Sequence, residues 1–367
     1  MDLIGSELRA NPDLYPLAFN VFQDSIYFVR LSEARYAEAS FLDQRVAAQG
    51  DEGGWAQWAP VAALAGRLEG ESDFIFHIGH VGSTLLARLL GLSPRVFSLR
   101  EPAILRVLAQ VAFDLPTAES PWSRETYDEH VEVFSRLWAR TYDATQKTLL
   151  KATSLVSEMA ADLMARSPTS RAIAMTVAPE VYMATILGGP ASRQELASTA
   201  QSRLRRLHRR IGESPWRLYD MSEGEQAAMS WACEMAGLAE AAAQAPDRVL
   251  WLDFERFLAD PAAGLAAALA HLHGQASEAD LQAMLLSPIF GRYSKGPEHA
   301  YDANLRRQVL NQARAEHAGE LAKGRAWLDR AGSDVPVVGQ ALGLVGLPER
   351  ARGVIGPDAD APGLPHA

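Results

Sequence analysis

A short glycine-rich stretch of the sequence combines residue types that bind anions. It reads Gly-His-Val-Gly-Ser-Thr, with an apolar run before it and a leucine-rich run after it. Glycine allows a tight turn and a close approach of the backbone to a ligand. If a helix begins here, its first amides point outward and favour a negative charge. We therefore predict a phosphate cradle, with hydroxyl donors from its serine and threonine, at Gly79, His80, Val81, Gly82, Ser83 and Thr84.

Three other interpretations of this stretch are a nucleoside-triphosphatase loop, a plain turn and a metal site. It is not the nucleoside-triphosphatase loop G-x-x-x-x-G-K-[ST], because its glycines are too close and no lysine precedes the hydroxyl. It could instead be a plain strand–helix turn in which Ser83 caps the helix. His77 and His80 have His-x-x-His spacing, but a metal site would need further ligands and no cysteine is nearby. We expect no metal, and we expect His77 to be a hydrogen-bonded core residue.

The elements that must position this loop alternate between short apolar strands and longer helices. A helical segment follows each of the strands expected at residues 74–78, 95–99, 148–151, 171–177 and 248–252. Such strands are typical of βαβ units with a buried parallel sheet. The sequence thus predicts an α/β fold, a three-layer sandwich around a central parallel sheet, with mostly helical insertions near 115–145 and 190–245. Ligands of such sheets bind at the carboxyl ends of the strands.

Two charged residues stand where the second and third expected strands end. Glu101 follows the second strand in Arg-Glu-Pro, and Lys151 ends the third. A lysine here would offset negative charge that grows on a leaving oxygen. A carboxylate would take the proton from an acceptor hydroxyl. Together with the cradle, they suit group transfer from an anionic donor. The alternative is that Glu101 only pairs with Arg100, Arg106 or Lys151 on a solvated rim.

The N-terminal part of the chain, residues 1–70, suggests no chemistry. In the N-terminal part we expect a strand at 26–31, a helix from Tyr36 to Val46, and packing of Trp55 and Trp58 against the main core. The C-terminal end is rich in Gly, Pro, Asp and Ala, and is expected to be mobile. The division predicted is an accessory segment, an α/β domain and an extension, at residues 1–70, 71–335 and 336–367.

Composition argues against several classes of protein. The 367 residues include 35 Lys and Arg against 45 Asp and Glu, a formal charge of −10. Such an acidic chain is a poor partner for nucleic acid, although a local basic pocket for a small anion remains possible. No apolar run approaches ~20 residues, so no membrane span is expected. With a lone cysteine, Cys233, and no secretory pattern at the N-terminus, we expect a cytoplasmic protein.

Taken together, these segments resemble the sulfotransferase superfamily, in its bacterial form. That family uses 3′-phosphoadenosine 5′-phosphosulfate (PAPS) as donor. The run FIFHIGHVGSTLLARLL resembles its 5′-phosphosulfate loop, and four later segments occur in the family's order: VFSLREP, TLLKATSL, RAIAMTVAPEVYMATIL and RVLWLDFERFLADP. The resemblance implies a P-loop-like nucleotide-binding topology and transfer of a sulfuryl group from PAPS to a hydroxyl or amine. The implied product is adenosine 3′,5′-bisphosphate (PAP), and no metal is implied.

The resemblance also implies roles for single residues. Residues 79–85, Leu85 included, would bind the 5′-phosphosulfate. Lys151 would support the leaving phosphate or the sulfuryl oxygens. Glu101 matches the general base of some bacterial relatives, and a histidine is the alternative base. His80 stands where the family usually has Lys or Arg, and would help to stabilise charge on the donor. A histidine can donate to an anion, but its charge depends on pH.

The 3′-phosphate region departs further from the family pattern. Thr185 falls at the usual serine position, and Lys295 and Gly296 belong to a late basic loop that would close over this phosphate. Val177 stands where the family normally has an arginine, which removes a bidentate donor. The substitute would come from that late loop or from the basic run LRRLHRR at 204–210. The alternative for this run is a solvated helix face.

Three functions stay open at this level. One is a PAPS-dependent sulfotransferase acting on a small-molecule or glycan acceptor, which the sequence does not identify. The others are a catalytically inactive binding module on the same fold and, more remotely, a small-molecule kinase that would need Mg²⁺ and a triphosphate lysine. A homodimer is expected only because homodimers are the commonest oligomers of soluble proteins. Aromatic candidates for the acceptor pocket, each more often a core residue, are Trp122, Trp138, Trp216, Tyr219 and Trp231.

Overall fold

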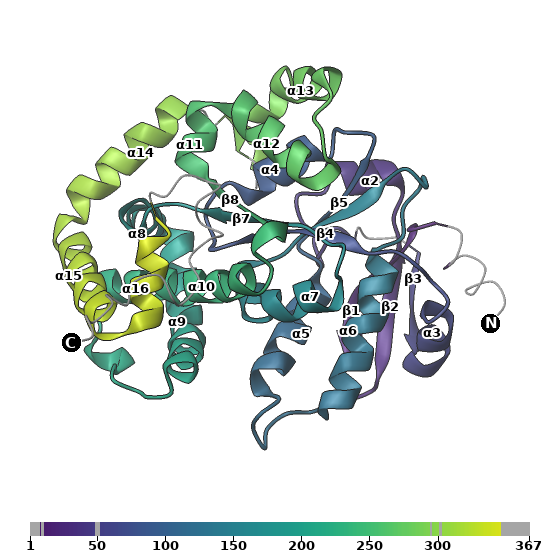
Figure 1. The fold of residues 1–367 in the computed structure, drawn as a ribbon, viewed down its shortest axis with the longest axis horizontal. Coiled ribbons are helices and arrows are strands. Elements are labelled where there is room, and N and C mark those ends of the chain that lie inside the picture. Colours follow the sequence, from purple (N-terminus) through teal and green to yellow (C-terminus); the bar gives the residue numbers. More distant parts are fainter. Residues whose placement is uncertain (1–7, 9–10, 48–51, 294–295, 301–302, 346–367) are drawn as a thin grey trace, which may run out of the picture.

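The centre of the molecule is a five-stranded parallel sheet with the strand order β5–β6–β4–β7–β8 (Figure 1). A computed structural model describes residues 8, 11–47, 52–293, 296–300 and 303–345. This confirms the predicted α/β fold with a central parallel sheet. The five strands are β4 (Ser72–His77), β5 (Val96–Arg100), β6 (Lys147–Lys151), β7 (Ala172–Thr176) and β8 (Val249–Asp253).

Helices cover both faces of this sheet, which explains its apolar strands. Every residue of β4, β5 and β7 is buried, as expected for parallel strands that are covered on both sides. In Figure 1, α4 (Ser83–Leu90) and α12 (Pro261–His273) lie above the sheet. The helices below it are α5 (Ala103–Asp114), α7 (Ala160–Arg166) and α10 (Glu223–Gln244).

The strand order reverses beside β4. After β4 the chain crosses to the edge strand β5 and returns to β6, and then it adds β7 and β8 on the other side. A crevice forms at such a reversal, at the carboxyl ends of the strands. The glycine-rich stretch leaves β4 at this point and leads into α4.

The N-terminal part forms a small antiparallel sheet beside the core. Its strands are β1 (Leu14–Asn20), β2 (Ser25–Arg30) and β3 (Gly53–Gln57), joined by the short α2 (Glu33–Glu38) and followed by α3 (Trp58–Ala65). The helix expected at 36–46 is wrong, because Ser32 caps a helix that ends at Glu38. Trp58 is buried as expected. Trp55 is 57% exposed, because it lies on the edge strand β3 beside Tyr27.

Both expected insertions are helical, and C-terminal helices pack against the second. The first contains α6 (Arg124–Trp138), and the second contains α9 (Pro190–Ile211) and the whole of α10. In Figure 1, α14 (Ala303–Glu316), α15 (Ala318–Asp334) and α16 (Pro336–Gly343) lie along α8 (Pro179–Gly188) and α10. Smaller elements are η1 (Ser154–Met159), η2 (Leu218–Asp220), η3 (Pro246–Arg248), α11 (Phe254–Ala259), α13 (Glu278–Leu285), η4 (Pro288–Gly291), β9 (Arg292–Tyr293) and β10 (Gly296–Ala300).

Two further expectations concern the C-terminal extension and a membrane span. The described part of the extension, α16, packs against α15 and α10, and its last residues, 346–367, lie outside the described residues. Within the described part of the chain, no helix combines the length and the apolar character that a membrane crossing requires.

Candidate functional site

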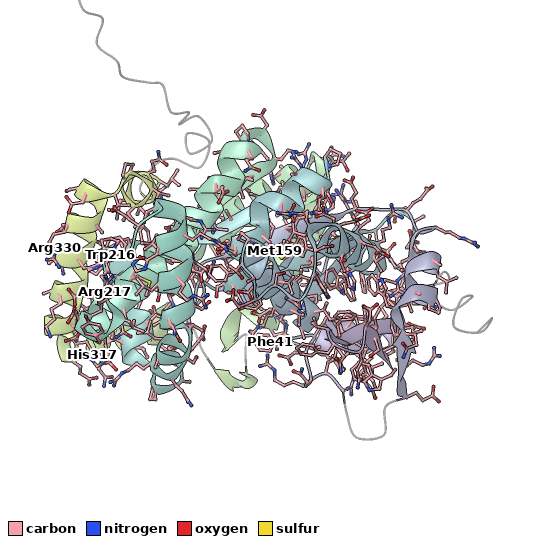
Figure 2. All side chains as sticks on the ribbon, turned by 90° about the horizontal axis from the view of Figure 1, so that it is seen from below. Phe41, Met159, Trp216, Arg217, His317 and Arg330 are labelled. Atoms are coloured by element: carbon pink, nitrogen blue, oxygen red, sulfur yellow. The ribbon has the colours of Figure 1, made fainter. Side chains whose placement is uncertain are left out.

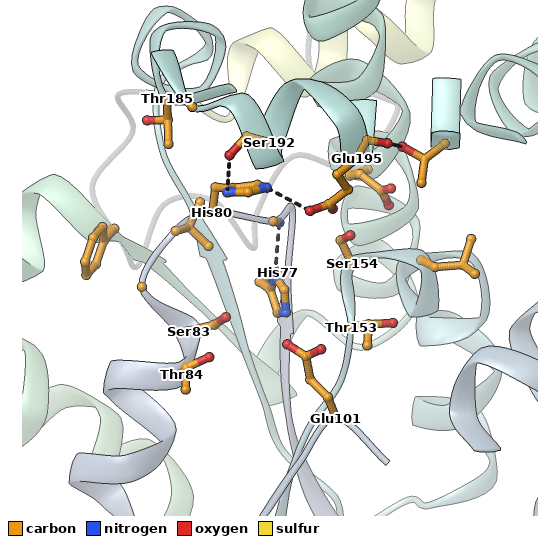
Figure 3. Close-up of a pocket in the computed structure, with 18 of the residues that line it drawn as sticks. His77, His80, Ser83, Thr84, Glu101, Thr153, Ser154, Thr185, Ser192 and Glu195 are labelled. Carbon is orange, nitrogen blue, oxygen red and sulfur yellow. Dashed lines mark hydrogen bonds and ion pairs between the residues drawn. The ribbon is translucent and has the colours of Figure 1, made fainter. Parts of the chain in front are cut away.

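A cavity of about 790 Å³ opens at the carboxyl ends of β4, β5 and β6 (Figure 3). This volume is in the usual range for small-molecule sites. Its walls come from the loop after β4, from the ends of the next two strands, and from helices α5, α8, α9 and α14. All seven residues of the predicted cradle, 79–85, lie on its wall, and so do Glu101, Lys151 and Thr185.

The loop that forms the cradle has a left-handed backbone at three positions. The φ angles are +90° at Gly79, +56° at His80 and +67° at Gly82. Gly82 is the N-cap of α4, and a Cβ atom there would lie 2.0 Å from the ring of Phe254. The alternative with Ser83 as the cap is therefore wrong. No side chain caps α4, so its first amides can bind an anion.

Two hydroxyls of the cavity wall are buried without a partner. Within the described part of the chain, Thr84 Oγ1 and Thr153 Oγ1 have no hydrogen-bond partner, although both residues are at most 5% exposed. Thr84 lies in the first turn of α4, next to Ser83 (Figure 3). A buried polar atom of this kind needs an explanation, and a bound anion would provide one.

The two histidines of the loop have different surroundings. His77 is buried; its Nε2 contacts the carbonyl of Ala152 at 2.8 Å, and its Nδ1 accepts from the amide of Gly79 at 3.0 Å. It is the hydrogen-bonded core histidine that was expected, although one edge of it faces the cavity. His80 reaches across to α9, with Nε2 3.2 Å from Glu195 Oε2 and Nδ1 3.5 Å from Ser192 Oγ (Figure 3).

Glu101 and Lys151 form an ion pair inside the cavity. Their strands are adjacent and parallel, and the amide of Glu101 donates to the carbonyl of Lys151 at 2.7 Å. The pair is buried, with side-chain exposures of 10% and 1%, so the alternative of a solvated rim is wrong. The second oxygen of Glu101 lies 3.7 Å from Arg106 Nη2, beyond hydrogen-bond distance.

The backbone of Glu101 is strained. Its φ is +54°, and only Asp24 and His80 share a positive φ among the non-glycine residues that the structure describes. Such a conformation costs about 1–3 kcal/mol, and it is kept where the surroundings hold it in place, often at functional sites. Of these three residues with positive φ, His80 and Glu101 line the cavity.

The basic run of α9 combines exposed and buried arginines: Arg205 and Arg209 are exposed, as a solvated helix face predicts. Arg203 and Arg206 are buried. Arg203 Nε lies 2.9 Å from Glu234 Oε1, and Arg206 Nη2 lies 3.0 Å from Glu234 Oε2. Arg206 Nε also lies 2.8 Å from Glu158 Oε2. Burial alone would raise the pKa of Glu234, but the two arginines hold it below its usual value. We call this group the arginine network: Arg203, Arg206, Arg209, Arg210, Glu158 and Glu234.

The structure describes only part of the region predicted for the 3′-phosphate. Thr185 lies on the cavity wall, where its hydroxyl donates to the carbonyl of Val181 at 2.7 Å. Val177 is buried, and its carbonyl accepts from Trp231 Nε1 at 3.0 Å. Lys295 lies outside the described residues, and Gly296 begins β10. Arg306 of α14, which the sequence did not single out, lines the cavity above the ring of Phe254.

The N-terminal part contributes two cavity residues that the sequence analysis missed. Phe41 and Arg45 line the cavity, although no chemistry was expected in this segment. Their position depends on Arg100, whose Nε donates to the carbonyl of Ala39 at 2.7 Å. Burial lowers the pKa of Arg100 to about 10. No local pattern could have shown this contact, because it joins residues 61 positions apart.

The aromatic candidates for an acceptor pocket lie elsewhere. Trp138 and Trp231 are core residues, and Tyr219 is 83% exposed. Trp216 packs against Trp327 in the helical part, away from Phe41 (Figure 2). None of the five predicted aromatic residues lines the cavity. The aromatic side chains on its wall belong to Phe41, Phe254 and Phe290.

Metal and thiol chemistry find no support among the described residues. They contain no group of three or more His, Cys, Asp or Glu side chains placed to hold a metal ion. Cys233 is buried on α10, and burial raises the pKa of its thiol to about 11. A thiol in this state is a poor nucleophile at neutral pH.

Comparison with known proteins gives similar solved structures and no similar sequence. No protein-family model matches the chain, and neither does any curated protein. A sulfotransferase domain from the curacin biosynthetic pathway is 12% identical, with a TM-score of 0.39, over 68% of this chain and 98% of that one. A sulfotransferase from Alicyclobacillus acidocaldarius is 14% identical, with a TM-score of 0.37, over 71% and 96%. A sulfotransferase from Mycobacterium tuberculosis is 18% identical, with a TM-score of 0.36, over 70% and 78%. With every TM-score below 0.5, these likenesses do not establish a shared activity.

Proposed function

We propose that the protein transfers a sulfuryl group from PAPS to a hydroxyl or amine of a small-molecule or glycan acceptor. The observation that carries this proposal is the position of the buried Glu101–Lys151 pair in the same cavity as the cradle. A cradle alone would suit any phosphate ligand. A lysine and a carboxylate beside it add the two charges that group transfer from an anionic donor needs.

The cradle fits the phosphosulfate end of such a donor. PAPS, when bound, supplies a sulfuryl group joined to a phosphate, and no metal is needed for its activation. The uncapped amides of α4 and the hydroxyl of Thr84, which has no partner among the described residues, would donate to its oxygens. His80 would add a donor from the same loop, and Thr185 would lie at the 3′-phosphate end of the cavity. Lys295 and Gly296 would close that end.

Glu101 and Lys151 divide the chemistry between them. Glu101 Oε2, which lies 3.7 Å from Arg106 Nη2, would accept the proton of the acceptor hydroxyl. The acceptor oxygen would then bond to sulfur, while the bond from sulfur to the bridging oxygen breaks. The electron pair of that bond stays on the phosphate of PAP, where Lys151 Nζ stabilises the negative charge.

The first test is calorimetric titration with PAP, with Mg-ATP as the control ligand. Tight binding of PAP alone supports the donor site, in spite of Val177. Binding of Mg-ATP alone would favour a kinase. Binding of neither would favour a catalytically inactive module on this fold, because a fold by itself does not fix an activity.

A further inference from the structure

One wall of the cavity is made by the N-terminal segment 39–46. It is fixed to the end of β5: the amide of Leu42 donates to the carbonyl of Arg100 at 2.7 Å. The hydroxyl of Tyr15 donates to the carbonyl of Leu42 at 2.9 Å. The guanidinium of Arg100 donates to the carbonyls of Ala39 and Tyr36. These bonds make the segment a fixed part of the cavity.

This wall and helix α5 each contribute one exposed arginine to the cavity that contains the proposed general base. Arg45 lies 3.7 Å above the ring of Phe41, and its side chain is 59% exposed. Arg106 of α5 is 60% exposed and lies 3.7 Å from Glu101. Arg45, Arg106 and Glu101 line the same cavity.

The charged residues of this wall interact electrostatically with the Glu101–Lys151 pair. Asp43 binds Arg45, with Nε 2.8 Å from Oδ1. Burial alone would raise the pKa of Asp43, but Arg45 and, more weakly, Arg106 lower it. The pKa of Arg45 is raised, mainly by Asp43 and also by Glu101. The cluster therefore has three cations, Arg45, Arg106 and Lys151, and two carboxylates.

The donors of these arginines are not fully used inside the protein. Asp43 engages Nε and Nη2 of Arg45, whereas a guanidinium has five N–H groups. Among the described residues, Arg106 forms one long ion pair, with Glu101. The wall of α9 that faces the same cavity adds hydroxyls from Ser198, Thr199 and Ser202.

We propose that Arg45 and Arg106 select an acceptor that is polyhydroxylated and carries a carboxylate near the attacked hydroxyl, as a uronic-acid sugar does. This rests on the proposed function. The planar fork of arginine matches a carboxylate in a bidentate way. The arginines also offset the repulsion between Glu101 and an anionic acceptor. The hydroxyls of α9 suit the remaining groups of a sugar.

The test is binding of matched disaccharides to the PAP-loaded protein, measured by calorimetry. The probes are a glucuronate-containing disaccharide, the same disaccharide with glucose in place of glucuronate, and its glucose 6-phosphate counterpart. We expect the uronate to bind at least about tenfold more tightly than the neutral sugar. The double variant R45Q/R106Q should lose this preference.

The matched control is Arg330→Gln. Arg330 is 64% exposed on α15, on the opposite side of the helical part from Phe41 (Figure 2). The Arg330→Gln variant should keep the preference of the wild-type protein for the uronate over the neutral sugar. If the double variant does not fold, as judged by thermal unfolding, the single variant Arg106→Gln replaces it, because Arg106 has one long contact only.

Three results would overturn the inference: equal affinity for the uronate and neutral sugars, tighter binding of the phosphosugar than of the uronate, or no saturable binding of the uronate. Retention of the preference in the variants would also contradict it. The PAP titration of the same samples reports separately on the proposed function. If PAP does not bind, the donor site fails, and the disaccharide titrations on the unloaded protein still test the arginine wall.

Discussion

The cradle and the arginine network are neighbours that use polar groups in opposite ways. In the cradle, residues 79–85, the backbone is left-handed at three positions and the buried hydroxyl of Thr84 has no partner among the described residues. In the arginine network, Glu234 is fully buried and is bound by Arg203, Arg206 and Ser157. The network holds more charge, but the cradle has more hydrogen-bonding capacity left for a ligand.

This difference shows that charge density alone does not identify a ligand site. The carboxylates of the network occupy its arginines, and both Glu158 and Ser157 belong to η1, which follows directly after the end of β6. The network therefore holds the segment that follows Lys151. Strain and unpartnered polar atoms point to the cradle instead. Four predictions test this division of roles, from the largest expected effect to the smallest.

Replacing Lys151 by Ala should reduce PAPS-dependent turnover by at least about 10³-fold, since it removes the charge that stabilises the leaving phosphate. Turnover is measured as release of PAP. Lys323→Ala is the control, because Lys323 is 58% exposed on α15 and far from the reaction. Full activity of the Lys151 variant would remove the proposed mechanism.

Replacing Glu234 by Gln should lower the free energy of unfolding by about 3–5 kcal/mol, because two buried arginines lose a carboxylate that both of them bind. Urea unfolding measures this change. The control on the same helix is Glu240→Gln, whose partner Arg210 is 3.6 Å away and which is 52% exposed; it should change stability by less than about 0.5 kcal/mol. Arg203 and Glu234 also line the cavity, so a loss of PAP affinity without a loss of stability would show that the network acts in ligand binding instead.

Replacing Thr84 by Val should weaken PAP binding about tenfold or more, since a hydrogen bond to a charged group is lost. The fold should keep its stability, because the hydroxyl has no internal partner to lose. Ser157→Ala should do the reverse, because its hydroxyl binds Arg206 at 2.7 Å. Calorimetry and thermal unfolding of both variants separate the two roles. Unchanged PAP affinity in the Thr84 variant would argue against the cradle.

The arginine network should also make the stability of the folded protein depend on pH. Burial raises and the arginines lower the pKa of Glu158 and Glu234, with a net value below the usual 4.5. This stability is therefore present above about pH 4.5 and is lost as the pH falls through the lowered pKa values of the folded state. Between pH 5 and about pH 3, the Tm of the wild type should fall more steeply than that of Glu234→Gln. Parallel curves would contradict this assignment.

Much of the central fold could be predicted from the sequence. The strands of the sheet are buried on both faces, so they read as apolar runs, and glycines mark the turn after β4. The ends of elements are harder to predict: the helix expected at 36–46 ends at Glu38, and the carbonyl of Ala39, the next residue, accepts a hydrogen bond from Arg100. Trp55 was assigned to the core by its type, but the edge position of β3 exposes it.

The sequence by itself determined the α/β class, the position of the cradle, and the residues Glu101 and Lys151 at the strand ends. These features depend on local patterns, such as apolar runs, glycine spacing and the first residue after a strand. Only the tertiary structure decided that the arginines of α9 face buried glutamates, and that Phe41 and Arg45 line the cavity. The physical reason is that burial of a charge depends on partners far away in the chain. Arg203 and Glu234 are 31 residues apart, and a single sequence contains no signal for that pairing.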